Sequence, residues 1–306
     1  MYKEKHVARS AFVPIRGLRY HVLEWQFGPL DPQLPPLVMV HGWMDVGASY
    51  QFMVDAFAPG FLQGRRLIAP DWRGFGLTQV ETDNFWFPDY LADLDALLDA
   101  LAPGQAVDLL GHSMGGNVVM AYGGIRPQRI RRLINLEGFG LAASRPSQAP
   151  GRYARWMDEL KLLHAGQMAL KGYDSLEGVA QRLIKTNPRL EPAKAAWLAS
   201  RWAQPDAQGQ WQILGHPAHK VTSAQLYRWD EMVELWRRIS APVLAVEAAN
   251  DSLTAWWKGA YTLDEYHQRL QGVPDVRVAV VQEAGHMVHH DRPAELARLI
   301  EDFLRA

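Results

Sequence analysis

The feature that most constrains this chain is a short apolar run that ends in a serine flanked by glycines. Residues 107–116 read Val-Asp-Leu-Leu-Gly-His-Ser-Met-Gly-Gly, and a helical pattern follows directly. A strand that turns this abruptly into a helix leaves the hydroxyl of Ser113 clear of the backbone at the carboxyl edge of a sheet. Gly111 and Gly115 fit because a Cβ at either position would clash where strand and helix approach each other. The motif predicts a nucleophile at Ser113, and the alternative is a glycine-rich turn that happens to hold a serine.

The rest of the chain provides the context that this motif needs, because apolar strands alternate with helical segments. Continuous apolar runs such as 37–40 are typical of strands buried on both faces of a parallel sheet. Besides the strand before Ser113, we predict strands at 7–13, 18–25, 37–40, 66–69, 132–136, 242–246 and 276–281, and helices at 48–57, 87–100, 263–270 and 292–304. The pattern predicts an α/β fold with a mostly parallel central sheet flanked by helices.

The alternation stops between about residue 142 and residue 240, where the sequence shows helical segments without strands. We therefore predict a core formed by residues 1–141 and 241–306, with an all-helical cap inserted at 142–240. An insertion placed just past the carboxyl end of a strand would cover Ser113. Six of the 12 tryptophans fall in it, and some of them would line a pocket.

Composition excludes several classes of function. The net charge is −1, so nothing suggests a nucleic-acid or membrane-surface partner held by bulk electrostatics. The chain contains no cysteine, which excludes disulfides and thiolate chemistry, and it has no apolar run of about 18 residues. No histidine pair has metal-ligand spacing in a carboxylate-rich setting. We expect a cytoplasmic monomer or homodimer that acts on a small molecule without a cofactor or a metal ion.

Candidate partners for Ser113 stand at the ends of other predicted strands. Gly42 would bring the amide of Trp43 to the same edge, and the amide of Met114 opens the helix after the serine. His286 follows a glycine after strand 276–281, whereas His289 and His290 are expected to be ordinary surface or helix-entry residues. A neutral imidazole can take the proton of a serine hydroxyl and return it to a leaving group.

Several motifs together resemble the α/β-hydrolase superfamily with a helical cap. They are His41-Gly-Trp43, Asp71-Trp-Arg-Gly-Phe-Gly76, Gly111-His-Ser-Met-Gly-Gly116, Asn250-Asp251 after an apolar strand, and Gly285-His286 before the last helix. The resemblance implies a Ser113 nucleophile, a His286 base and an oxyanion hole formed by the amides of Trp43 and Met114. It also implies Asp251 as the acid that orients His286, with Glu137, at the end of strand 132–136, as the alternative.

The resemblance also narrows the reaction. Haloalkane dehalogenases and epoxide hydrolases resemble this chain but need a carboxylate nucleophile, so a serine at position 113 argues against both. We expect a carboxylesterase-like enzyme for small to medium, mainly apolar esters, because the cap is rich in Trp, Leu and Met. The alternatives are another acyl or carbon–carbon bond hydrolase, a perhydrolase, or a non-catalytic hydrolase-like receptor for a small ligand.

Overall fold

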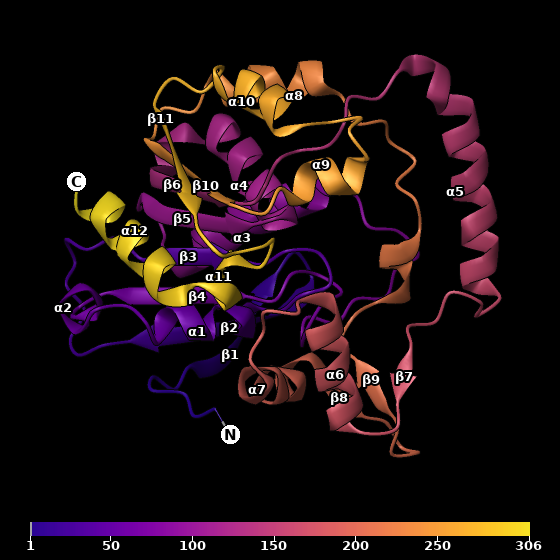
Figure 1. Ribbon diagram of the computed structural model, residues 1–306, viewed down its shortest axis with the longest axis horizontal. Helices are drawn as coiled ribbons and strands as arrows, with labels where there is room; N and C mark the ends of the chain where they lie inside the picture. Colours follow the sequence, from indigo (N-terminus) through magenta and orange to yellow (C-terminus); the bar gives the residue numbers. More distant parts are fainter. Residues whose placement is uncertain (1) are drawn as a thin grey trace.

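The computed structural model describes residues 2–306, and its core is an eight-stranded sheet (Figure 1). The strands run in the order β1-β2-β4-β3-β5-β6-β10-β11, in which β2 is antiparallel to both of its neighbours and the other pairs are parallel. Their bounds are β1 Arg9–Ile15, β2 Leu18–Gln26, β3 Leu37–Val40, β4 Arg66–Pro70, β5 Val107–His112, β6 Ile130–Leu136, β10 Val243–Ala248 and β11 Val276–Val281. The predicted mostly parallel sheet is confirmed.

Alternate residues along the strands face opposite layers of helices. On β3, Leu37 and Met39 belong to one apolar cluster, and Val38 and Val40 belong to the other. One layer contains η1 (Gly47–Tyr50), α1 (Gln51–Val54), α2 (Pro59–Leu62), α11 (Val288–Asp291) and α12 (Pro293–Arg305); the other contains α3 (Phe87–Leu101), α4 (Met114–Ile125), α8 (Trp229–Trp236) and α10 (Leu263–Leu270). This double burial explains why the central strands are apolar throughout.

Within residues 2–306, none of the helices has the length and apolar character needed to cross a bilayer.

The inserted segment is not purely helical, so that prediction is wrong. It contains η3 (Pro146–Gln148), α5 (Ala149–His164), α6 (Leu176–Thr186), α7 (Pro192–Trp202) and η4 (Pro217–Lys220). It also contains a three-stranded antiparallel sheet made of β7 (Gly172–Tyr173), β8 (Ala203–Pro205) and β9 (Trp211–Ile213). Strands of two or three residues are too short to show a period-two pattern, and this explains why they were not predicted.

The elements of the insertion differ in how they meet the core. Helices α6 and α7 share an apolar cluster with Val46 and Phe52 of the core. Helix α5 has no buried residue and stands at one side of the molecule in Figure 1. Helix α8 packs on α4, and its Trp236 belongs to the core cluster. The packed core therefore resumes at α8 rather than at residue 241.

The turn from β5 into α4 brings backbone into very close contact with backbone. A Cβ built at Gly111 would lie 2.3 Å from the carbonyl oxygen of Gly115, and a Cβ at Gly115 would lie 2.3 Å from the carbonyl oxygen of Val40. Real Cβ atoms do not approach backbone oxygens this closely. Both positions therefore require glycine, as the sequence motif predicted.

We expect Gly115→Ala to destabilise the protein, because β3 or α4 must shift to admit the methyl group. The free energy of unfolding should fall by about 1–3 kcal/mol, the usual cost of overpacking. Urea unfolding followed by circular dichroism measures this change. The matched control is Gly60→Ala in α2, where an added Cβ has no neighbour within 4 Å. Equal stability of the two variants would contradict the steric argument.

Candidate active site

Ser113 stands between β5 and α4 in a strained conformation, with φ 53° and ψ −115°. Its amide donates to the carbonyl of Leu136 at 2.8 Å, and its carbonyl accepts from the amide of Asn117 at 3.0 Å. Met44 and Glu137, which follow the ends of β3 and β6, also have positive φ. Strained residues of this kind persist only where the surrounding structure holds them, and they gather at functional sites. The carboxyl edge of the sheet is therefore the candidate site.

The loop after β3 passes directly beside the serine. A Cβ built at Gly42 would lie 3.1 Å from the Cβ of Ser113 and 3.0 Å from Nδ1 of His112. In the part of the chain that the structure describes, the amides of Trp43 and Met114 donate to no backbone carbonyl. Two amides without a backbone partner next to one serine are what an oxyanion hole requires. The assignment of the hole to Trp43 and Met114 stays a prediction.

His286 lies in the loop between β11 and α11, where two aromatic neighbours position it. Nε2 of His112 donates to the carbonyl oxygen of His286 at 2.8 Å, so the residue before Ser113 holds the backbone of His286. The ring of Trp256 packs edge-on against the imidazole, with 4.2 Å between the ring centroids. Nδ1 of His286 lies 3.2 Å from Oε2 of Glu137. A carboxylate at Nδ1 favours the tautomer with the proton on Nδ1, which leaves Nε2 free to act as a base.

Glu137, not Asp251, is the carboxylate that contacts His286, and this corrects the preference from the sequence. The Glu137 side chain is buried, and besides His286 it accepts from the amide of Ala248 at 2.6 Å and from Oγ of Ser252 at 2.8 Å. The Asp251 side chain is exposed and caps α9 (Ser252–Trp257) by accepting from the amide of Thr254 at 2.8 Å. Asp251 is thus engaged in a helix cap, while the longer side chain of Glu137 reaches His286.

Burial shifts the titration of both members of this pair. Desolvation raises the pKa of Glu137 to about 7, against the opposing effect of its hydrogen bonds from Ala248 and Ser252, and the nearby charge of Asp251 raises it further. Desolvation lowers the pKa of His286 to about 3. The imidazole is therefore neutral at pH 7, as a general base must be. When it takes a proton, the adjacent Glu137 carboxylate stabilises the imidazolium.

The other histidines of the site differ in their surroundings. Nε2 of His41 accepts from the amide of Trp72 at 2.9 Å, so His41 fixes the path of two neighbouring loops. His289 and His290 are buried, with 0% and 4% of their surfaces exposed, which contradicts the expectation that they lie at the surface. Their rings lie beside one another on α11, at 4.3 Å between centroids.

Sequence reasoning missed two residues that the structure places at the pair. Ser252 donates to Glu137, and Trp256 covers the His286 ring. Both belong to the short helix α9 after Asp251. The only signal for them in the sequence was their position just after a strand end. At that strand end the sequence analysis favoured the carboxylate of Asp251 instead.

Comparisons with known proteins agree with this architecture. A family model described as "alpha/beta hydrolase fold" matches residues 35–293. A serine hydrolase-like protein of Danio rerio is 24% identical over 279 residues, which cover 88% of this chain and 81% of that protein. A cis-3-alkyl-4-alkyloxetan-2-one decarboxylase of Shewanella oneidensis is 25% identical over 282 residues, which cover 90% of this chain and 83% of that protein. The solved thioesterase domain from the curacin biosynthetic pathway superposes with a TM-score of 0.79 at 23% identity, over 96% of this chain and 99% of that one.

The chain therefore belongs to the α/β-hydrolase fold family. The family supports hydrolase chemistry, but one fold carries several reactions, so the substrate must be argued from the site itself.

We expect Glu137→Gln to remove the low-field proton resonance of a carboxylate-bound imidazole Nδ1–H, because the amide no longer attracts that proton as a carboxylate does. Asp251→Asn, which preserves the cap of α9, should leave the resonance in place. For a reaction that uses His286 as base, turnover should fall by on the order of 10³ to 10⁴ in Glu137→Gln and by roughly tenfold or less in Asp251→Asn. The reverse ranking would return the acid to Asp251.

Proposed function

We propose that this protein is a serine hydrolase that cleaves carboxylic esters through an acyl-enzyme intermediate. The observation that carries the proposal is the contact of His286 Nδ1 with the buried carboxylate of Glu137 at 3.2 Å. His112, which precedes the strained Ser113, links the serine turn to this pair by a hydrogen bond to the backbone carbonyl of His286. A serine at a strand-to-helix turn, a neutral histidine and an orienting carboxylate are the three groups that acyl transfer requires.

In the proposed acylation step, Nε2 of His286 takes the proton of Ser113 as Oγ attacks the carbonyl carbon of the ester. The carbonyl oxygen becomes an oxyanion and receives hydrogen bonds from two amides. The amide of Met114 lies at the N-terminus of α4, and the amide of Trp43 lies in the neighbouring loop after β3. The imidazolium then returns the proton to the departing alkoxide, and the alcohol leaves. Deacylation repeats these steps with water in place of Ser113.

The proposed role of Glu137 is electrostatic. Its carboxylate holds the Nδ1 proton of His286 and so fixes which nitrogen faces the serine. During the reaction it also compensates for the positive charge that forms on a buried imidazole. The hydrogen bonds from Ala248 and Ser252 keep the carboxylate in place without neutralising it.

Two exposed tryptophans beside the site support an apolar substrate. Trp43 and Trp256 are 52% and 55% exposed, although large aromatic side chains are usually buried. Trp256 packs against the His286 ring, and Trp43 follows the glycine that passes Ser113. Surfaces of this kind bury the apolar part of a small ligand. We therefore propose neutral esters with small to medium acyl or alcohol groups.

We expect Ser113→Ala to lower the hydrolysis of p-nitrophenyl butyrate by on the order of 10⁴ to 10⁶ in kcat, because triad members act as one unit. Ser200→Ala is the control, since Ser200 is an exposed residue of α7 whose hydroxyl bonds its own helix. A tenth of wild-type activity in Ser113→Ala would refute the nucleophile. If the wild-type protein binds p-nitrophenyl esters of different acyl length but hydrolyses none of them, the result would instead indicate a non-catalytic receptor.

We expect activity across p-nitrophenyl esters to peak on short or medium neutral acyl chains and to fall on succinyl esters, whose charge would have to be desolvated against tryptophan. Trp256→Ala should raise KM for the preferred ester by roughly tenfold, about 1.4 kcal/mol. Phe12→Ala is the matched control, because Phe12 is an exposed aromatic residue on edge strand β1. Preference for a charged acyl group would contradict the proposed pocket.

A further inference from the structure

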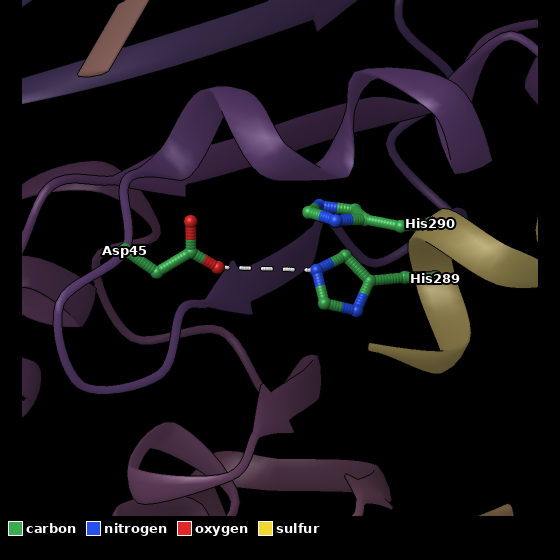
Figure 2. Close-up of side chains that lie close together, drawn as sticks. All are labelled: Asp45, His289 and His290. Atoms are coloured by element: carbon green, nitrogen blue, oxygen red, sulfur yellow. Dashed lines mark ion pairs between the residues drawn. The ribbon is translucent and has the colours of Figure 1, made fainter. Parts of the chain in front are cut away.

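A second group of titratable side chains lies behind the candidate active site and takes no part in the proposed reaction. Asp45 comes from the loop after β3, and His289 and His290 come from α11 (Figure 2). All three side chains are buried, and one ligand atom from each lies within 4.8 Å of the others. Two imidazoles from a short helix and one carboxylate from a loop therefore converge.

Several polar atoms of this group have no hydrogen-bond partner among residues 2–306. They are Oδ2 of Asp45, Nδ1 and Nε2 of His289, and Nε2 of His290. Buried polar atoms almost always have a partner in folded proteins. One nitrogen of each imidazole and one carboxylate oxygen of Asp45 lie close enough together to share a single partner that the described polypeptide does not supply.

The carboxylate of Asp45 is oriented so that one oxygen remains for that partner. Oδ1 accepts from the amide of Val46 at 2.9 Å, from Nε1 of Trp202 at 3.0 Å and from the hydroxyl of Ser49. Oδ2 lies 3.9 Å from Nε2 of His289 (Figure 2). That separation is too long for a hydrogen bond, but it is close to the roughly 3.4 Å between two ligands of a tetrahedral zinc ion.

We propose that Asp45, His289 and His290 bind a divalent transition metal ion such as Zn²⁺ through two imidazole nitrogens and one carboxylate oxygen. Imidazole ligands favour Zn²⁺, Co²⁺ and Ni²⁺ over Mg²⁺ and Ca²⁺, which prefer sites made of oxygen alone.

The position of this site gives the ion a structural consequence. Asp45 follows Trp43 by two residues, and His289 follows His286 by three. The ring of His289 also lies 4.5 Å from that of His112, which holds the backbone of His286. A bound ion would thus tie the loop after β3 to α11 and stabilise the folded protein. The inference depends on these three side chains and not on ester hydrolysis.

The test is metal binding by untagged wild-type protein that has first been stripped with EDTA. Calorimetry with Zn²⁺ should show one equivalent bound, and Co²⁺ should give the visible absorption of a nitrogen-coordinated ion. Metal at a hundred times its Kd should raise Tm by roughly 5 °C for a chain of this size. Absence of tight binding by the wild-type protein would overturn the proposal and leave ordered water as the common partner.

Variants then locate the ion. His290→Gln and Asp45→Asn should each abolish the metal-dependent rise in Tm and the cobalt spectrum. His164→Gln should retain both, because His164 is an exposed residue at the end of α5, away from the cluster. Retention of both signals in His290→Gln, or their loss in His164→Gln, would refute the assignment of the ion to Asp45, His289 and His290.

If the two site variants do not fold, X-ray absorption of the zinc-loaded wild-type protein decides the question. Scattering from two imidazoles and at least one oxygen supports the proposed ligands. A shell made only of oxygen refutes them.

Discussion

The site depends on one close approach, in which the backbone of β5 and α4 meets at Gly111 and Gly115 and presses against the end of β3. This contact brings the consecutive elements β5 and α4 against β3, which lies much earlier in the chain, and Ser113 stands at the turn because no side chain separates the strands from the helix. The loop after β3 then passes beside Ser113 and offers amides, and His112 reaches across to the backbone of His286. A looser turn would leave the same residues present but too far apart to act together.

A second constraint is the burial of opposite kinds of titratable groups. Desolvation raises the pKa of Glu137 to about 7 while hydrogen bonds favour its charged form, and desolvation lowers the pKa of His286 to about 3. Neither group would be stable as an isolated buried charge. Together they form a pair in which the appearance of charge on one is compensated by the other, and this is the property that a proton-transferring site needs.

Much of this arrangement could be predicted from the sequence. Local patterns predict the succession of strands and helices along the chain, the two glycines of the turn, and the positions of Ser113 and His286. Each of these signals lies within a few consecutive residues, where a strand end, a glycine and a polar residue follow one another. The acid could not be predicted, since Asp251 and Glu137 both follow strands and only three-dimensional packing shows which side chain reaches His286. The burial of His289 and His290 was also hidden, because two polar residues at a helix start have no apolar period. The short strands β7 to β9 depend on pairing with one another, a non-local property.

The placement of Glu137 at the end of β6 also affects how such an enzyme can change. The residues after β10 contribute a hydroxyl from Ser252 to Glu137 but no group of the proposed triad, so most of the segment from Asp251 to Trp257 is free of the geometric demands of that triad. Trp256 sits on this released segment and against the His286 ring. Directed evolution that samples α9 can therefore reshape the surface beside the candidate site while Ser113, Glu137 and His286, held after β5, β6 and β11, are inherited unchanged.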